Sequence, residues 1–160
     1  MTCPYTPEQI ERGLTDKDED LRCTWAMCTE FTPTPEQIER GLTDVYYLVR
    51  VFWAERMDFT PTYAQIERGL SDESMMVRSA WAERMDWNPT PIQIEKGLSD
   101  ISEEVRRAWA ERMDFTPTSE QIRRGLCDKS HRVRQAWDKR VSGELAKSIV
   151  SAEHISWASL

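Results

Sequence analysis

The side chains in this sequence that are best suited to acid–base catalysis are two histidines, His131 and His154. Neither has a recurring partner, whereas such catalysis needs a tuned group in a cleft with a positioned neighbour. The sequence also has no nucleophile motif, no glycine-rich phosphate loop and no His-x3-His pair. We therefore predict that the protein is not an enzyme and has no catalytic or cofactor-binding residues.

The four cysteines are the next candidates, because thiolates bind metals and iron–sulfur clusters. Cys3, Cys23 and Cys28 are separated by 19 and 4 residues, and Cys127 lies far along the chain. This spacing differs from the paired Cys-x2-Cys motifs of zinc and cluster sites. We predict ordinary reduced thiols and no bound metal.

The elements that carry these residues form an internal repeat. An isoleucine, a glycine, a leucine, an aspartate, an arginine and a tryptophan each recur at a step of 28 residues, for example from Trp25 to Trp137. Such a period predicts a solenoid in which each repeat buries its apolar face against its neighbours. The five repeats cover residues 3–30, 31–58, 59–86, 87–114 and 115–142.

Each repeat is expected to form two helices, and the second repeat illustrates the first of them. Thr34, Pro35 and Gln37 make a capping-box pattern at the start of this helix. Gly41 allows the helix to end, or allows another helix to approach it closely.

The second helix is expected to start at Asp44, as its cap, and to run to about Met57. Val49, Trp53 and Met57 are four residues apart, which predicts one apolar stripe. Tryptophans at a regular step can also stack on nucleic-acid bases. Their place on the apolar stripe predicts instead that they are core residues.

The two ends of the chain depart from the repeat, as terminal capping units do. Cys3 takes the position of the Phe or Trp that opens the other repeats, so we expect it at an apolar core position. Apolar residues from Leu145 to Ile155 are three or four residues apart, which predicts an amphipathic closing helix.

The pattern Gln-Ile-x2-Gly-Leu followed by Asp-x4-Val-Arg-x2-Trp-Ala resembles HEAT-like α-solenoid repeats, especially the short leucine-rich-variant type. The resemblance covers residues 3–142. It implies an all-α fold, a right-handed α-solenoid of five two-helix repeats with a C-terminal capping helix (143–160), as one domain over residues 1–160. Members of this class bind proteins or nucleic acids, and a few are enzymes or enzyme subunits, so the fold alone does not decide the function.

In HEAT-like families the repeated aspartate and arginine form a ladder between neighbouring repeats. The resemblance therefore implies a structural role for Asp16, Asp44, Asp72, Asp100 and Asp128 and for Arg22, Arg50, Arg78, Arg106 and Arg134.

The four residues after the repeated aspartate differ most between repeats. They are KDED at 17–20, VYYL at 45–48, ESMM at 73–76, ISEE at 101–104 and KSHR at 129–132. Because packed helices lie about 8–10 Å apart, these blocks are expected to line up along one edge of the stack. Val45 and Ile101 are expected to point toward the apolar stripe and to be partly buried.

Tyrosine and methionine are favoured at the centres of interfaces, so we predict a protein-binding surface at this edge. Its residues are Tyr46, Tyr47, Leu48, Met75 and Met76, with the acidic residues Asp18, Glu19, Asp20, Glu103 and Glu104. One alternative is that Leu48 and Met76 only pack on the neighbouring repeat, and another is that the edge forms a homodimer.

Charge is unevenly distributed along the chain, whose net charge is −7. The first repeat has seven acidic residues against three basic ones, and the fifth has three against seven. This polarity can orient a charged partner, and it is also typical of a solvated acidic cap with an incidental basic end.

The negative net charge disfavours binding to nucleic acid. Nucleic-acid binding through the basic fifth repeat is nevertheless the alternative hypothesis. Its phosphate contacts would be Arg123, Arg124, Lys129, Arg132 and Lys139, with Arg134 and Arg140 beside them.

No apolar run approaches the ~20 residues of a membrane span, and the N-terminal residues have no signal-peptide pattern. We therefore expect a cytoplasmic protein with no membrane partner. The leading hypothesis is a protein-binding module, monomeric or weakly dimeric, that acts as an adaptor or an occluding inhibitor of a larger protein with a basic surface. Its size and acidity also fit a phage- or plasmid-encoded inhibitor of a host nuclease or defence complex. The remaining hypothesis is a structural or self-assembling repeat.

Overall fold

The computed structural model describes residues 3–143, and every regular element in this range is an α-helix. The predicted all-α class is therefore confirmed, whereas nearly all of the predicted closing helix, residues 143–160, lies outside the described range. The chain divides into two compact units, residues 1–88 and 89–160, and each unit is described by itself. None of the described helices combines the length and apolar character that crossing a membrane requires.

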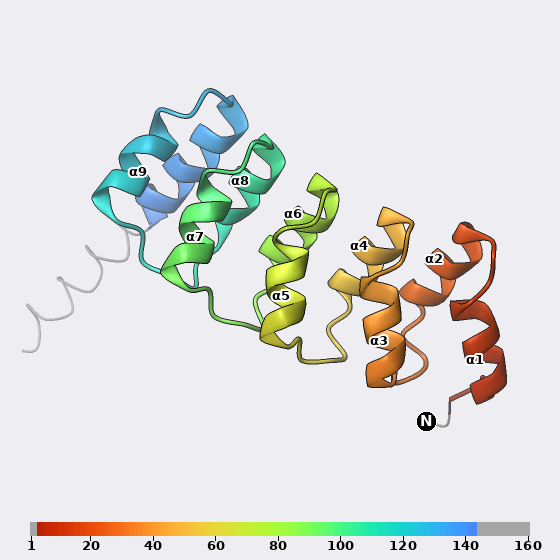
Figure 1. Ribbon diagram of the computed structural model, residues 1–160. Coiled ribbons are helices and arrows are strands. Elements are labelled where there is room, and N and C mark those ends of the chain that lie inside the picture. Colours follow the sequence, from red (N-terminus) through yellow and green to blue (C-terminus); the bar gives the residue numbers. More distant parts are fainter. Residues whose placement is uncertain (1–2, 144–160) are drawn as a thin grey trace, which may run out of the picture. The chain divides into compact units, whose positions relative to one another are not determined.

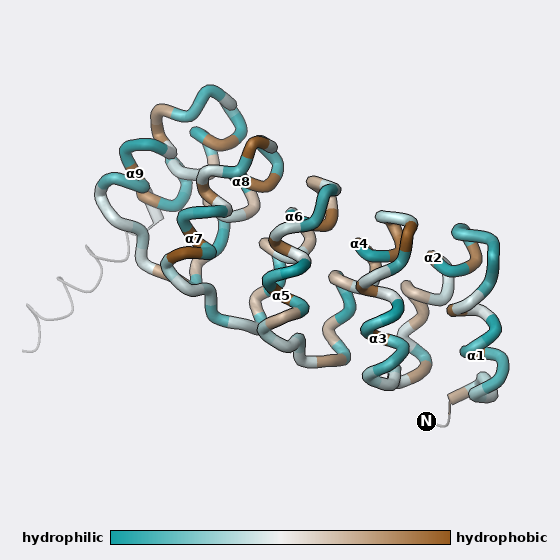
Figure 2. Tube along the Cα trace, in the orientation of Figure 1, coloured by the Kyte–Doolittle hydropathy of each residue, from teal (hydrophilic) through white to brown (hydrophobic). Residues whose placement is uncertain are grey.

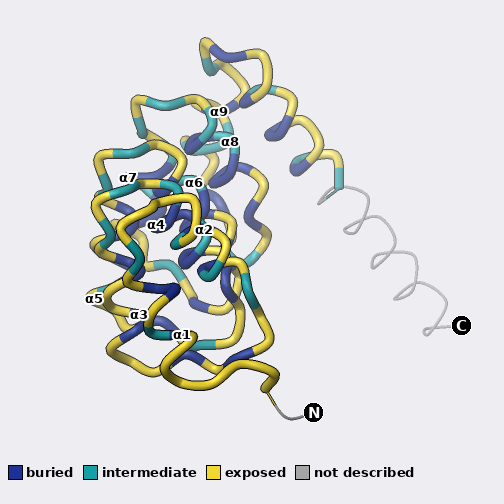
Figure 3. The backbone as a smooth tube through the Cα atoms, turned by 90° about the vertical axis from the view of Figure 1, so that its right-hand side faces the viewer, coloured by how far each residue is buried: buried dark blue, intermediate teal, exposed yellow. Residues whose placement is uncertain are grey.

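The first unit consists of three helix pairs, in which each first helix packs on the second helix of its own repeat (Figure 1). The second helices also pack on one another, α2 on α4 and α4 on α6. The helices are α1 (Pro7–Leu14), α2 (Glu19–Met27), α3 (Pro35–Leu42), α4 (Tyr47–Glu55), α5 (Tyr63–Gly69) and α6 (Met75–Glu83). Every one of them has both buried and exposed residues (Figure 3).

The second unit repeats the same arrangement. Helix α7 (Pro91–Leu98) packs on α8 (Glu103–Glu111), α9 (Ser119–Leu126) follows, and residues 131–143 are helical up to the end of the described range. Its core includes Ala110, Val133, Ala136 and Trp137, with Leu98 and Ile122 packed against them.

The capping box predicted at the start of each first helix is confirmed. Gln37 N donates to Thr34 Oγ1 at 3.3 Å, and Thr34 N donates to the Gln37 side chain at 3.0 Å. The same reciprocal pair begins α1, α5, α7 and α9. Two donors that the first helical turn leaves unpaired are thereby satisfied.

The repeated glycines serve close approach rather than helix termination. A Cβ added to Gly41 would lie far closer to the Trp53 indole than van der Waals contact allows. The other glycines in this position meet the tryptophan of their own repeat in the same way, and they are Gly13, Gly69, Gly97 and Gly125. The indole thus lies directly against the backbone of the first helix.

The tryptophans are core residues, as predicted. Trp53, Trp81, Trp109 and Trp137 are each 1% exposed, so none of them is accessible to a nucleic-acid base. The first repeat differs, because Trp25 is only half-buried and contacts Tyr5, with ring centroids 4.9 Å apart.

The second helices are shorter than predicted. Asp44 lies two residues before Tyr46, the N-cap of α4, and its carboxylate accepts a hydrogen bond from Tyr46 N at 2.8 Å instead of capping the helix directly. The prediction that Met57 lies on the apolar stripe is wrong, because α4 ends at Glu55 and Met57 is 63% exposed.

The main feature that the sequence patterns did not predict is a buried arginine late in, or just after, the second helix of every repeat but the first. These arginines are Arg56, Arg84, Arg112 and Arg140. Arg56 is 5% exposed, and its guanidinium lies 4.8 Å from the Phe31 ring and 5.0 Å from the Trp53 ring. It donates to the carbonyl oxygens of Ala26, Cys28 and Phe31 at 3.0, 2.6 and 3.2 Å. Since α2 ends at Met27, the arginine of one repeat satisfies carbonyls at the helix end of the repeat before it.

The same arrangement explains the exposure of Cys3, which was wrongly predicted to be a core residue. In the second, third and fifth repeats the aromatic residue at this position lies under the arginine that follows 25 residues later, as Phe31 lies under Arg56. In the first repeat that arginine is replaced by Cys28. The covering guanidinium is therefore missing.

We expect Gly41→Ala to lower the free energy of unfolding by at least about 1–3 kcal/mol, because the new methyl group displaces the Trp53 ring. The measurement is urea unfolding followed by circular dichroism. Gly143→Ala is the matched control, since nothing lies within 4 Å of a Cβ at that glycine. Equal stability of the two variants would contradict the proposed indole contact.

We expect Arg56→Met to cost at least about 3 kcal/mol, because three carbonyl groups lose their donor. Arg40→Met is the control, as Arg40 makes an ion pair with Glu11 in which both side chains are more than 40% exposed and such pairs contribute at most about 1 kcal/mol. Chemical denaturation of both variants distinguishes a buried structural arginine from an ordinary surface one.

Candidate protein-binding surface

The predicted surface residues of the first unit lie at the starts of its second helices. Tyr46 precedes α4, Tyr47 and Leu48 begin it, and Met75 and Met76 begin α6. Because α6 packs on α4, these residues lie on adjacent helices. Figure 2 shows hydrophobic residues at the starts of α4 and α6, whereas the start of α2 is hydrophilic.

This surface is exposed, and it includes a residue that was predicted to be partly buried. Val45 is 91% exposed, Met75 is 49%, Met76 is 45% and Tyr47 is 37% exposed, whereas Tyr46 and Leu48 are half-buried. We call Val45, Tyr46, Tyr47, Leu48, Met75 and Met76 the Tyr–Met patch.

The predictions for Val45 and Ile101 are wrong for one shared reason. Each lies between an aspartate and the residue whose N–H donates to that aspartate, Tyr46 in the first case and Ser102 in the second. The middle residue of such a tight turn projects outward, and Ile101 is accordingly 87% exposed.

The aspartate–arginine ladder fixes the backbone of the Tyr–Met patch. Arg22 donates to the Asp44 carboxylate at 2.8 and 2.9 Å, and the same carboxylate holds Tyr46 N. Arg50 donates to the carbonyl oxygens of Asp44 and Val45 at 2.7 and 3.3 Å. The turn that presents VYYL is therefore held from both sides.

Within each unit the ladder joins the repeats as the resemblance implied. Arg50 contacts Asp72 at 2.8 Å in the first unit, and Arg106 contacts Asp128 at 2.7 Å in the second.

Acidic residues of α2 adjoin the aromatic part of the surface. Burial raises the pKa of the Tyr46 phenol, and the neighbouring Tyr47, Asp20, Cys23 and Glu19 raise it further. The Tyr46 and Tyr47 rings meet edge to face, with centroids 5.5 Å apart. Asp18 precedes α2, and Glu19 and Asp20 begin it, all three exposed.

The remaining acidic candidates belong to the second unit. Glu103 and Glu104 begin α8, where Glu103 is exposed and Glu104 is half-buried. Glu104 accepts from Arg107 at 3.2 Å and from Arg132 at 2.8 Å. Its charge is thus neutralised within the unit, in contrast to the acidic residues of α2.

Most basic candidates for phosphate binding are engaged in ion pairs or buried. Arg123 pairs with Glu120, Arg124 with Glu95 and Arg132 with Glu104. These three arginines remain partly exposed, and Lys129 and Lys139 are exposed.

Arg140 and Arg134 have structural contacts instead. Arg140 is 3% exposed, lies over the Phe115 ring and donates to the Ala110 carbonyl at 3.2 Å, so it cannot reach a phosphate. Arg134 donates to the carbonyl oxygens of Asp128 and Lys129 at 2.7 and 3.1 Å.

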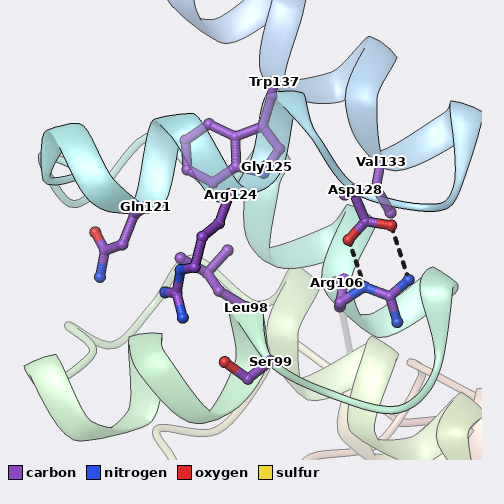
Figure 4. Close-up of a pocket in the computed structure, with 9 residues that line it drawn as sticks. All are labelled: Leu98, Ser99, Arg106, Gln121, Arg124, Gly125, Asp128, Val133 and Trp137. Carbon is purple, nitrogen blue, oxygen red and sulfur yellow. Dashed lines mark hydrogen bonds and ion pairs between the residues drawn. The ribbon is translucent and has the colours of Figure 1, made fainter.

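A cavity of about 170 Å³ lies in the second unit, between α7, α9 and the last helical segment (Figure 4). Both arginines that line it are already paired, Arg106 with Asp128 and Arg124 with Glu95. It therefore offers no free charge to a ligand and is best described as a seam between two repeats. Its lining residues are Leu98, Ser99, Arg106, Gln121, Arg124, Gly125, Asp128, Val133 and Trp137.

The cysteines of the described range do not form a cluster. Cys23 is buried and Cys28 half-buried, whereas Cys3 and Cys127 are exposed. Over residues 3–143 no group of three Cys, His, Asp or Glu side chains could hold a metal ion.

A second set of variable positions lies on the second helices and was not among the predicted site residues. Positions 51, 79 and 107 are Val, Ser and Arg in successive repeats, while 55, 83 and 111 are all Glu. Positions 51, 79 and 107 vary as much as the block after the aspartate, so this variation was a signal available in the sequence.

No protein-family model matches the chain, and no curated protein or solved structure shows a match to it. The resemblance to HEAT-like repeats therefore stays a prediction, supported by the residues that carry it.

The ladder makes stability depend on pH in the acidic range. Burial raises the pKa of the Asp128 carboxyl, but hydrogen bonds from Arg106 and Ser130 N lower it by more, so its pKa lies below the ordinary 3.8. A lowered pKa gives stability that is present above the ordinary value and is lost as the pH falls through the lowered one.

We therefore expect Asp128→Asn to lower the Tm at neutral pH and to differ less and less from wild type as the pH falls below the ordinary pKa of 3.8. Thermal unfolding of both proteins across this range is the measurement. Asp138→Asn, at an exposed aspartate outside the ladder, is the control. A Tm difference that stays constant with pH would show that the ion pair is not the cause.

Proposed function

We propose that this chain is a non-enzymatic protein-binding module, an adaptor or an occluding inhibitor, built as a right-handed α-solenoid of five 28-residue repeats with a C-terminal capping helix. The exposure of the Tyr–Met patch is the observation that supports this proposal. Four of its six side chains remain 37–91% exposed after the helices of the first unit have packed. A contiguous apolar surface of this kind is typical of a contact site.

Internal packing alone does not account for the patch. Leu48 is half-buried between helices, but Val45 is 91% exposed and makes little contact with the rest of the fold. In three of the four other repeats, the position that corresponds to Tyr47 holds a polar or charged residue. These residues are Glu19, Glu103 and His131. The fold therefore does not require an aromatic residue at this position.

A protein partner suits this surface better than nucleic acid does. Asp18, Glu19 and Asp20 begin the helix next to α4, and Glu73 precedes α6. Carboxylates at these positions repel a phosphate backbone, whereas large apolar side chains release water on contact with a protein surface.

The test is affinity capture from a lysate, read by mass spectrometry, with wild type and a Val45→Asp/Tyr47→Asp variant. We expect a protein captured by wild type to be lost with the variant, because two carboxylates at the centre of the contact are left without partners. Circular dichroism establishes that both proteins fold.

Tyr63→Asp is the matched control, because Tyr63 is an exposed tyrosine that begins a helix of the same unit, as Tyr47 does. It should capture the same partner as wild type. Equal capture by Val45→Asp/Tyr47→Asp and wild type contradicts the proposed site, and recovery of nucleic acid would favour the basic fifth repeat instead.

A further inference from the structure

The outward face of α4 combines an apolar end with an acidic end. Leu48, Phe52 and Glu55 are four and three residues apart, so they lie on one side of the helix. Leu48 and Phe52 are half-buried and Glu55 is exposed, whereas Val49, Trp53 and Ala54 on the other sides are buried. Leu48, Phe52 and Glu55 therefore keep part of their surface accessible once the helix has packed, whereas Val51 on the same side is buried.

Helix α6 has the same organisation beside it. Met76, 45% exposed, is followed on the same side by the buried Ala80 and the exposed Glu83. Since α4 and α6 pack side by side (Figure 1), the two helices form one surface. We call it the α4–α6 face, with Leu48, Phe52 and Met76 at its apolar end and Glu55 and Glu83 at its acidic end.

The acidic end has no cation of its own. Within residues 3–143 no hydrogen bond or ion pair is made to Glu55, and Glu83 accepts only a long one, 3.5 Å from Ser79 Oγ. Burial raises the pKa of Glu55, and the negative charge of Glu83 raises it further. Two carboxylates therefore lie near each other beside an apolar surface without compensation.

In helix α8 the glutamate that corresponds to Glu55 and Glu83 has a cation beside it. Glu111 there accepts from Arg107, four residues earlier, at 3.1 and 3.2 Å. In α4 and α6 the residues that correspond to Arg107 are Val51 and Ser79. The α4–α6 face has thus replaced the internal cation by small or apolar side chains.

We infer that the α4–α6 face binds a basic amphipathic helix of the partner protein, with its apolar residues on Leu48, Phe52 and Met76 and a Lys or Arg between Glu55 and Glu83. This inference rests on the proposed function and names the chemistry of the partner. Seven residues separate Leu48 from Glu55, which is about 10 Å along a helix axis. The partner's apolar and cationic side chains are therefore about two turns apart.

The contact is continuous with the Tyr–Met patch, because Leu48 and Met76 belong to both surfaces. The acidic start of α2 adds attraction for the same positive partner. Because these carboxylates are exposed, we expect binding to weaken as the salt concentration rises.

The test uses a synthetic, end-blocked helical peptide of about 18 residues, long enough to be helical, with leucines and lysines two turns apart on one face. Its control peptide has glutamate in place of each lysine. We expect wild type to bind the lysine peptide in calorimetry, and Glu55→Gln/Glu83→Gln to bind it about tenfold more weakly. Glu111→Gln is the matched protein control, because the same substitution there removes a carboxylate that already has its arginine.

Failure of wild type to bind the lysine peptide, equal binding of both peptides, or equal binding by Glu55→Gln/Glu83→Gln would each overturn the inference. These isosteric changes at exposed positions leave the fold intact, which thermal unfolding verifies. The proposed function fails separately, if Val45→Asp/Tyr47→Asp retains the captured partner. If Val45→Asp/Tyr47→Asp loses the partner and Glu55→Gln/Glu83→Gln retains it, the protein-binding function is supported. The inference that the partner binds through a basic helix is then rejected.

Discussion

The contact between a tryptophan indole and a glycine sets the geometry on which the rest of this protein depends. With the Trp53 ring against the backbone at Gly41, the second helix of a repeat can lie only at one depth and rotation beside the first. The same rotation buries Val49 and directs Leu48 and Glu55 outward. The surfaces proposed for binding are thus a consequence of how the indole is seated.

Two arginines then position one repeat against the next, at opposite ends of the second helix. Arg56 holds carbonyls at the C-terminal end of α2, and Arg22 holds Asp44 in the turn before α4. Planar guanidinium groups suit both roles, because they donate several hydrogen bonds in fixed directions. The turn that carries Tyr46 and Tyr47 is rigid for this reason, and its side chains are presented with little freedom to lose on binding.

Periodicity and local capping chemistry predicted the helix pairs, the capping boxes and the buried tryptophans, and the resemblance to HEAT-like repeats implied the Asp–Arg ladder. The sequence patterns failed where a few residues of helix length decide the outcome, as at Met57 and Val45. The burial of Arg56 was also not predicted, because a charged residue that follows a glutamate is expected to be exposed to solvent. Only the structure shows the carbonyl oxygens to which Arg56 donates. The variability of the four residues after the aspartate predicted an exposed Tyr–Met patch. The absence of a cation beside Glu55 among the described residues could be recognised only from the structure, which shows α4 and α6 together.

The arginine that reaches back to the preceding repeat has a consequence for how such a chain can change over generations. Arg56 and Arg84 bind main-chain oxygens one repeat earlier, and main-chain oxygens are present whatever the side chains are. A duplicated 28-residue segment would carry its own donor and supply acceptors for the next, so recombination could lengthen or shorten the array without new junctions. The outward-facing positions are then free to diverge in each copy, which is the kind of divergence that VYYL represents.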